Sequence, residues 1–260
     1  MNILQRLADH ARSRVAGAKM QRSTEELKAI ARNLPGSGYS FEKALGKEGL
    51  SFICECKKAS PSRGLIAPDF PYLTIAKEYE LAGADAISVL TEPSEFLGSG
   101  RYLEEIAASV SVPCLRKDFT VDEYMIYEAK LMGAEAVLLI CAISSREQLK
   151  RYISVCDQLE LSALVEAHDE DEIRTALECG ARIIGVNNRN LKDFSVDTGH
   201  SAKLRELVPP GVLFVAESGI KNASDTEAMH RIGADAVLVG ETLMRAKDKR
   251  KKLAELRGNL

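Results

Sequence analysis

The sequence contains no apolar run near the roughly 20 residues that a membrane-spanning helix needs. Its first residues, 1–7, predict an amphipathic helix without the long apolar core of an export signal. It also has no excess of basic residues, since the net charge is −3 and the pI is near 5.9. Neither nucleic acid nor an anionic membrane surface is therefore an expected partner. We expect a cytoplasmic protein that acts on a small molecule.

Cysteine and histidine are sparse and scattered. The six cysteines form no C-x-x-C pair, and the four histidines do not cluster with them. Cys54 and Cys56 flank Glu55, but no further Cys/His pair completes the four ligands of a structural zinc site. Cys54, Cys114 and Cys141 lie in apolar stretches, where a thiol acts as a small hydrophobic side chain. We therefore expect reduced cysteines and no metal site.

One short pattern occurs four times: a helical stretch ends at Gly, and an apolar run follows. The copies are residues 81–89, 131–139, 178–186 and 231–239. Gly suits the left-handed position that follows a helix. Runs rich in Val, Ile and Leu are typical of parallel strands covered on both faces. The repeat predicts alternating helices and parallel strands.

The same alternation extends over most of the chain. Strands are predicted at 51–57, 84–90, 112–116, 135–141, 161–166, 182–187, 212–217 and 235–240. Helices are predicted at 71–82, 99–109, 121–132, 145–159, 169–179, 199–207 and 222–232, with a short one after Gly240. This order predicts an α/β fold of the (β/α)8 TIM-barrel type. A doubly wound open sheet is the alternative, but the G-x-G-x-x-G that often follows its first strand is absent.

Residues 1–48 precede the first predicted strand and contain two or three helical stretches, broken at 34–38. They predict a helical extension packed on a barrel of residues 49–260, within one structural domain. No room is left for a second barrel, so we expect a single activity. Asp122 and Asn222 have side chains suited to the N-caps of the helices that follow them.

Polar residues gather where the predicted strands end, although the strand bodies are apolar. In chain order the ends are Glu55/Lys57, Thr91/Glu92, Lys117/Asp118, Cys141, Glu166/His168, Asn187/Arg189, Glu217/Ser218 and Gly240/Glu241. In such barrels the chemistry lies at the C-terminal ends of the strands, which surround one pocket. Solubility alone does not account for so many polar ends on one rim, and the pattern predicts an active site there.

Glu55 and Lys57 are charged residues within an apolar strand. Because strand side chains alternate, both share a face with Ile53. We expect that face to point into the barrel, so that both charges meet a ligand at its top.

The loops after the seventh and eighth strands, 217–220 and 239–242, predict a phosphate site. In many barrels these loops bind phosphate through backbone N–H groups. Gly219 and Gly240 would let those groups approach an anion, and Arg189 would add a forked donor. A simple turn is the alternative for either glycine alone.

Longer motifs in the chain resemble those of the indole-3-glycerol phosphate synthase family. They are Glu55-x-Lys57-x-x-Ser60-Pro61-Ser62, Ser88-Val-Leu-Thr-Glu92 with Phe96-x-Gly98-Ser99, Leu115-Arg-Lys117-Asp118-Phe119, Leu164-Val-Glu166, Gly185-Val-Asn187-Asn-Arg189-Asn-Leu191, Ala216-Glu217-Ser218-Gly219-Ile220 and Val239-Gly240. They follow the family's order between residues 50 and 245, and the helical extension is also similar.

The resemblance implies a decarboxylating and dehydrating ring closure. The substrate is 1-(2-carboxyphenylamino)-1-deoxyribulose 5-phosphate, and the products are indole-3-glycerol phosphate, carbon dioxide and water. The resemblance implies no metal and no organic cofactor, and we expect a monomer.

The resemblance also implies roles for residues. Lys117 is the general acid of ring closure, and Glu166 is the general acid/base of dehydration. Lys57 orients the substrate anion, and its share of proton transfer relative to Lys117 stays open. The other residues implied in catalysis, which hold the lysines or the substrate's polar groups, are Glu55, Asn187, Glu217 and Ser218.

Substrate-binding residues follow from the same resemblance. The implied phosphate site consists of Ser60, Arg189, Ser218, Gly219, Gly240 and Glu241. The implied wall for the aromatic ring consists of Pro61, Leu90, Phe96 and Phe119. Some relatives carry Ser at the position of Glu241, where its hydroxyl can help to bind phosphate. A carboxylate that faced the phosphate would repel it. We expect its side chain to turn away and its backbone N–H, at a helix N-terminus, to remain available.

Some of these residues also have simpler structural roles open to them. Lys117 and Asp118 could form a surface ion pair, Glu166 could cap the next helix, and His168 has the position of an ordinary loop histidine. A general acid works best with its pKa near neutrality, and we expect a crowded cationic pocket to lower the pKa of Lys117.

Three other functions compete with the leading one. A phosphoribosylanthranilate isomerase would favour an acid/base pair without two lysines in the pocket. A class I aldolase would use Lys57 or Lys117 as a Schiff base. A non-enzymatic binder of phosphate ligands does not require the charged rim.

Overall fold

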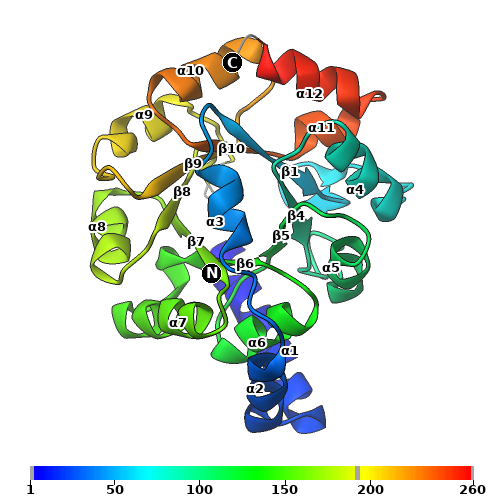
Figure 1. Cartoon of the computed structure of the whole chain (residues 1–260), viewed down its shortest axis with the longest axis vertical. Helices are drawn as coiled ribbons and strands as arrows, with labels where there is room; N and C mark the ends of the chain where they lie inside the picture. The colour runs from blue at the N-terminus through cyan, green and yellow to red at the C-terminus, as the bar shows by residue number, and fades with distance from the viewer. Residues whose placement is uncertain (1–2, 191–193, 259–260) are drawn as a thin grey trace.

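Eight parallel strands form a closed barrel in the computed structural model, which describes residues 3–190 and 194–258 (Figure 1). They are β1 (Ser51–Cys56), β4 (Ala86–Leu90), β5 (Cys114–Lys117), β6 (Ala136–Ile140), β7 (Ser162–Ala167), β8 (Ile183–Asn187), β9 (Leu213–Glu217) and β10 (Ala236–Val239). Neighbours in the chain are neighbours in the barrel, and β1 closes the ring by pairing with both β4 and β10. The predicted TIM barrel is confirmed, and the open-sheet alternative is wrong.

Helices follow the strands and surround the ring. They are α4 (Tyr72–Leu81), α5 (Gly100–Ala107), α6 (Glu123–Leu131), α7 (Arg146–Gln158), α8 (Glu170–Glu178), α9 (Gly199–Arg205), α10 (Ala223–Arg231) and the short α11 (Glu241–Arg245). The predicted N-caps are confirmed, because the side chains of Asp122 and Asn222 accept hydrogen bonds from the first turns of α6 and α10.

Four elements were not predicted. A last helix, α12 (Lys249–Arg257), packs on α4 and α10. A short antiparallel pair, β2 (Ala59–Ser60) and β3 (Gly64–Leu65), folds the loop after β1 back on itself. A single 3-10 turn, η1 (Cys141–Ile143), follows β6. The short pair fixes the shape of a loop that lies beside the cavity described below.

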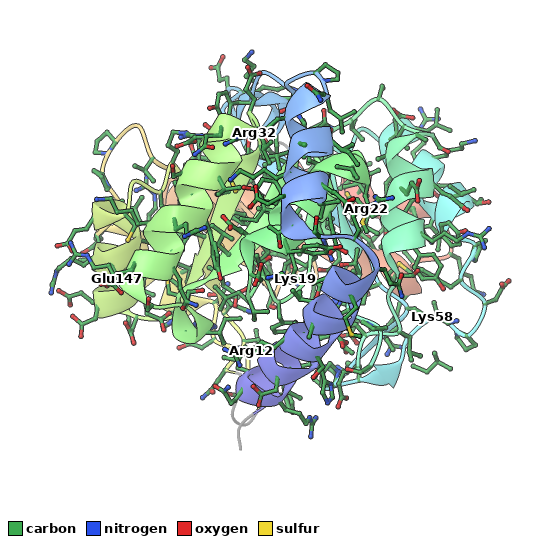
Figure 2. The ribbon with its side chains drawn as sticks, turned by 90° about the horizontal axis from the view of Figure 1, so that it is seen from below. Arg12, Lys19, Arg22, Arg32, Lys58 and Glu147 are labelled. Carbon is green, nitrogen blue, oxygen red and sulfur yellow. The ribbon has the colours of Figure 1, made fainter. Side chains whose placement is uncertain are left out.

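Three helices precede β1: α1 (Ile3–Gln21), α2 (Thr24–Asn33) and α3 (Ser40–Leu45). Phe41 and Leu45 of α3 are fully buried against barrel-interior side chains such as Ile53. α3 therefore covers the end of the barrel where the strands begin, and in Figure 1 it lies in front of the ring of strands. α2 packs on α6, and Figure 2 shows α1 and α2 along the outside of the barrel. A domain boundary between residues 48 and 49 stays a prediction.

The core has two layers. One consists of side chains inside the barrel, including Ile53, Leu115 and Leu164. The other lies between the strands and the surrounding helices, and Phe52 and Cys54 belong to it. The alternation of β1 thus places Ile53 and Glu55 on the inner face, as the sequence predicts.

Candidate active site

A single cavity at the C-terminal ends of the strands collects the predicted site residues. They are Glu55, Lys57, Ser60, Pro61, Leu90, Phe96, Lys117, Phe119, Glu166, Asn187, Arg189, Glu217, Ser218, Gly219, Gly240 and Glu241. Three apolar residues of α1, Ile3, Leu4 and Leu7, also line the cavity. The sequence pattern did not assign these three to the site, because an amphipathic helix gives no sign of what it packs against.

Lys117 lies among carboxylates at the end of β5. Its Nζ is 3.2 Å from Oε2 of Glu217 and 3.8 Å from Oε2 of Glu166, and its side chain is 14% exposed. Burial lowers the pKa of Lys117, but the charges of Glu217, Glu166 and Glu55 outweigh burial and raise it above the ordinary value. The expected cationic surroundings are therefore wrong, because the neighbouring strands present carboxylates to this lysine. At neutral pH its ammonium group is charged and carries a proton to donate.

Glu217 has a pKa above that of an ordinary surface carboxylate. Burial raises its pKa, Lys117 lowers it and Glu166 raises it again, and the result is a pKa of about 7. Its Oε1 is buried and has no hydrogen-bond partner within residues 3–190 and 194–258. A group that titrates near neutrality beside a lysine can exchange protons with a ligand.

Glu55 and Lys57 form a hydrogen-bonded ion pair at the mouth of the barrel. Glu55 is buried, and the pair lies directly against the backbone of Gly240. A Cβ at Gly240 would collide with Glu55 and would lie 2.7 Å from Nζ of Lys57. The glycine after β10 therefore allows the charged pair of β1 to approach it, in addition to any contact with a ligand.

Glu166 is the residue before the last in β7 and does not cap the next helix. The N-cap of α8 is Asp169, whose carboxylate accepts a hydrogen bond from Glu172 N over 2.9 Å. Burial raises the pKa of Glu166, but His168, Lys117 and Asn187 outweigh burial and lower it. Glu166 therefore stands in the cavity as a carboxylate, and the alternative of a helix cap is wrong.

His168 contacts the candidate site, although the sequence pattern predicted only an ordinary loop histidine at this position. Its Nε2 lies 3.3 Å from Oε1 of Glu166. Strand alternation was the available signal, because a residue two positions after Glu166 shares its face if the strand continues.

Asn187 joins the loops at the phosphate end of the cavity. Its Oδ1 accepts hydrogen bonds of 3.0 Å from Ser218 Oγ and from Arg189 N. Ser218 has a φ of 68° and Gly219 a φ of 93°. A left-handed conformation is costly for serine and is held here by these contacts, which turn the loop after β9 toward the cavity.

Arginines surround Glu241, the residue where the family resemblance is weakest. Its Oε2 is 3.2 Å from Nε of Arg63, and its Oε1 is 3.0 Å from Nε of Arg245. Arg189 lies on the same side of the cavity, and burial lowers its pKa. Because both oxygens of Glu241 pair with guanidinium groups, its charge is largely neutralised at this end of the cavity.

An apolar wall faces the charged cluster. Phe96 and Phe119 lie with ring centroids 6.1 Å apart. The loop that carries Phe96 is held by the fully buried Glu92, whose carboxylate accepts hydrogen bonds from the backbone of Ser94 (2.9 Å), Glu95 (2.8 Å) and Phe96 (3.1 Å). The wall therefore has a fixed shape before any ligand binds.

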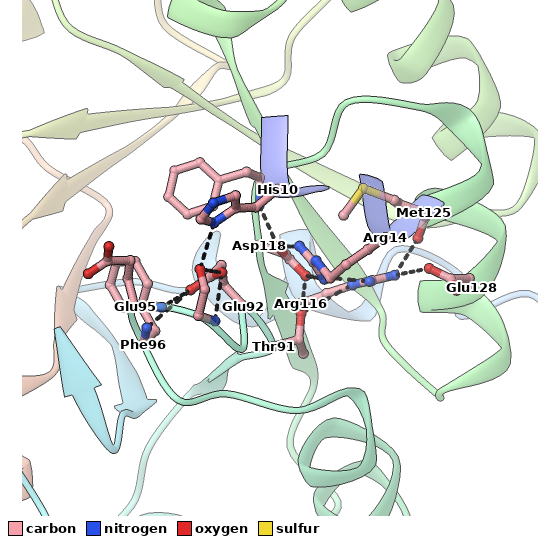
Figure 3. A network of polar contacts seen from close by, with 12 residues as sticks. His10, Arg14, Thr91, Glu92, Glu95, Phe96, Arg116, Asp118, Met125 and Glu128 are labelled. Atoms are coloured by element: carbon pink, nitrogen blue, oxygen red, sulfur yellow. Dashed lines mark hydrogen bonds and ion pairs between the residues drawn. The ribbon is translucent and has the colours of Figure 1, made fainter. Parts of the chain in front are cut away.

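Asp118 links α1 to the loop that follows Lys117 (Figure 3). Arg14 of α1 donates two hydrogen bonds to its carboxylate, of 3.0 and 2.7 Å, and Thr91 donates a third of 2.6 Å. Arg116 lies 3.5 Å away. Asp118 is only 1% exposed. A surface ion pair between Lys117 and Asp118 is therefore wrong.

Metal-binding clusters and membrane-spanning helices are both absent from the described part of the chain. Among residues 3–190 and 194–258, no three His, Cys, Asp or Glu side chains are arranged to hold a metal ion. No helix in the same residues is long and apolar enough to cross a membrane.

Comparisons with known proteins agree on one family. The model of the family described as "Indole-3-glycerol phosphate synthase" matches residues 4–256. A protein of that name from Ruminiclostridium cellulolyticum is 56% identical and covers 99% of both chains. Another of that name, from Endomicrobium trichonymphae, is 52% identical and covers 98% of this chain and 99% of its own.

Solved structures with low identity share the fold alone. A crystal structure of 3-hexulose-6-phosphate synthase has a TM-score of 0.66 at 15% identity, over 81% of this chain and 100% of that one. The family is therefore decided by the family model, which matches residues 4–256, and by relatives that match over almost their whole length. The chain belongs to the indole-3-glycerol phosphate synthase family.

Proposed function

We propose that this chain is an indole-3-glycerol phosphate synthase. It closes the ring of 1-(2-carboxyphenylamino)-1-deoxyribulose 5-phosphate and releases carbon dioxide and water. The observation that supports this most is the buried Lys117 between Glu166 and Glu217, in a cavity with an apolar wall on one side and arginines on another. That arrangement matches an anionic sugar phosphate attached to an aromatic ring.

The proposed first step is attack of the aromatic ring carbon on the ketone of the substrate. Lys117 donates a proton to the ketone oxygen as the new C–C bond forms, so that a hydroxyl and not an alkoxide results. The carboxyl group on the ring then leaves as carbon dioxide. Glu217, with a pKa of about 7, lies 3.2 Å from Lys117 and can return a proton to it.

The proposed second step is dehydration. Glu166 acts as the acid/base that helps the hydroxyl to leave as water. Before ring closure, Lys57, paired with Glu55, orients the substrate carboxylate, and Asn187 positions the substrate. Phe96, Phe119, Leu90 and Pro61 are the proposed contacts of the aromatic ring.

The proposed phosphate site lies at the loops after β8, β9 and β10. Its members are Ser60, Arg189, Ser218, Gly219, Gly240 and the backbone of Glu241. We also propose that the protein acts as a cytoplasmic monomer. All the proposed site residues come from one chain, and sedimentation at assay concentrations tests the oligomeric state.

Replacement of Arg189 by alanine is expected to weaken substrate binding more than turnover. A contact to phosphate is made in the ground state and the transition state alike, so KM should rise by about one to two decades if the contact is worth roughly 1.5–3 kcal/mol. Arg174→Ala is a matched control, because Arg174 is exposed on α8, pairs with Glu170 and Asp171 of the same helix and does not line the cavity. A collapse of kcat at unchanged KM would show that Arg189 does not act as a phosphate ligand.

The activity assay separates the competing functions. The purified chain is mixed with the anthranilate-derived substrate, and the indole chromophore and carbon dioxide are followed together. An isomerase would form neither product, and a non-enzymatic binder would leave the substrate unchanged. Borohydride would trap a covalent adduct at Lys57 or Lys117 only if the chain acted as a class I aldolase. Absence of indole in all conditions would refute the proposed function.

A further inference from the structure

His168 bridges two carboxylates at the end of β7. Its Nε2 lies 3.3 Å from Oε1 of Glu166, and its Nδ1 lies 3.2 Å from Oε2 of Glu172 on α8. The backbone N–H of His168 donates to the same oxygen of Glu172 over 2.7 Å. Nε2 of His200, on α9, contacts the carbonyl oxygen of His168 at 2.9 Å. The imidazole ring is thus held by a hydrogen bond at Nδ1, by hydrogen bonds at its backbone, and by an ion-pair contact at Nε2.

The two contacts of the ring favour its charged form. A neutral imidazole has one N–H and one lone pair, so one of its nitrogens would face a carboxylate without a proton between them. The imidazolium ion has two N–H groups: Nδ1 donates to Oε2 of Glu172, and Nε2 lies 3.3 Å from Oε1 of Glu166 in an ion pair that lacks the alignment of a hydrogen bond. Burial lowers the pKa of His168, but these two carboxylates outweigh burial and raise it to about 10. The ring is therefore a cation at neutral pH.

Glu166 lies between this cation and another one. Lys117 approaches Oε2 at 3.8 Å, while His168 approaches Oε1. The other titratable groups near these two side chains or their partners are Glu217 on β9, Glu55 on β1, Glu172 on α8, His200 on α9 and the thiol of Cys141 in η1. Since the carboxylates would repel the negative charge of Glu166, the two cations oppose that repulsion.

We infer that His168 is a positioning residue for the dehydration step, because its imidazolium holds Glu166 in one orientation as a carboxylate ready to accept a proton. The inference rests on the role proposed above for Glu166. Glu166 takes a proton from the carbon next to the hydroxyl-bearing carbon, and the C–H electrons form the ring double bond. The C–O bond breaks, and the hydroxyl leaves as water with a proton from Lys117 or Glu217.

The test compares the wild type with His168→Gln, which keeps a side-chain N–H donor but has no charge. The titration of the Glu166 carboxyl is followed by 13C NMR in protein labelled at glutamate carboxyls, with the signal assigned by its absence in Glu166→Gln. Removal of an opposite charge at this distance shifts a carboxyl pKa by about one unit or more. We therefore expect the titration midpoint of Glu166 to rise by about one unit in His168→Gln.

The rate–pH profile gives the second readout. In His168→Gln the acid limb of kcat should move up by about the same amount, so that the loss of kcat approaches about tenfold below the wild-type midpoint of Glu166 and disappears toward neutral pH, with little change in KM. An unchanged midpoint of Glu166 would overturn the inference, whatever happens to kcat. So would a loss of kcat that is equal at every pH, because that is the pattern of a merely structural role.

Two controls keep the test specific. His200→Gln removes a contact to the backbone of His168 but leaves the facing side chains in place, so the Glu166 midpoint should stay at its wild-type value. If His168→Gln does not fold, His168→Asn replaces it with the same expected midpoint. The NMR titration does not depend on turnover, and failure of the proposed function would appear separately as absence of indole from the wild type.

Discussion

Replacement of Lys117 by methionine is expected to lower kcat by two decades or more, with the fold intact and the Kd of a product-like ligand near that of the wild type. A positioned general acid contributes roughly 10²–10⁴-fold in rate. Methionine keeps an unbranched stem, so packing around the buried chain changes little. The measurements are steady-state kinetics, thermal unfolding and titration with the ligand.

The control for this experiment is Lys57→Met. Lys57 lies at the cavity mouth, paired with Glu55, whereas Lys117 lies between Glu166 and Glu217. We expect the Lys57 variant to lose activity with a larger share in KM, because that lysine also neutralises substrate charge. The reverse pattern, an inactive Lys57 variant and an active Lys117 variant, would exchange the two roles. Activity in both variants would eliminate proton donation by lysine.

Loss of Lys117 also affects Glu217. Lys117 lowers the pKa of Glu217, while burial and Glu166 raise it to about 7. In Lys117→Met the carboxyl of Glu217 should therefore hold its proton to a higher pH than in the wild type. This difference supplies a check that the lysine and the two carboxylates act as one cluster, independent of turnover.

The sequence pattern predicts the barrel well because its signals are local. Gly133 follows the C-cap of α6, and the apolar residues after it form β6. The same order of helix, glycine and strand recurs in the other repeats. The polar strand ends predict the rim for the same reason, since the direction of a parallel strand decides which end faces the site. The helix α12 gave no such signal, because it is followed by no strand.

The charge around Lys117 could not be predicted in the same way. Glu166 and Glu217 are carried by β7 and β9, and only closure of the ring brings both within 4 Å of the lysine. An isolated motif such as Lys117-Asp118 suggests instead that the aspartate is the partner. In the structure the carboxylate of Asp118 pairs with Arg14 and Arg116. Lys117 pairs instead with the carboxylates inside the barrel.

The surface on which α1 packs also could not be predicted from the sequence pattern. Its apolar residues indicate that one face is buried, but not against which surface. The structure shows that Leu7 lines the cavity and that Arg6 pairs with Glu95 over 2.6 Å. His10 contacts Ser94 at 3.0 Å in the same loop. The buried face of α1 thus packs on the barrel, and these polar contacts at its edge join it to residues that are distant in the sequence.

Replacement of Asp118 by asparagine is expected to lower the free energy of unfolding by about 3 kcal/mol. The side chain keeps its shape but loses the charge that Arg14 and Arg116 share (Figure 3). Arg116 is only 4% exposed and keeps its pair with Glu128 at 3.2 Å, but it loses Asp118, and breaking a buried ion pair typically costs about 3 kcal/mol or more. Chemical denaturation at pH 7 measures the change. The matched control is Asp122→Asn, which keeps a good N-cap for α6 and removes only the exposed pair with Lys19, so it should cost less than about 1 kcal/mol.

The pH dependence of this loss has a definite sign. Burial raises the pKa of Asp118, but Arg116, Arg14 and Thr91 outweigh burial and lower it in the folded protein. A group whose pKa is lowered by folding stabilises the protein above its unfolded pKa, and that contribution disappears as the pH falls through the folded value. The gap between wild type and Asp118→Asn should therefore be full at neutral pH and shrink in acid below the ordinary aspartate range. A gap that stays constant as the pH falls through and below that range would show that the arginines do not act through the charge of Asp118.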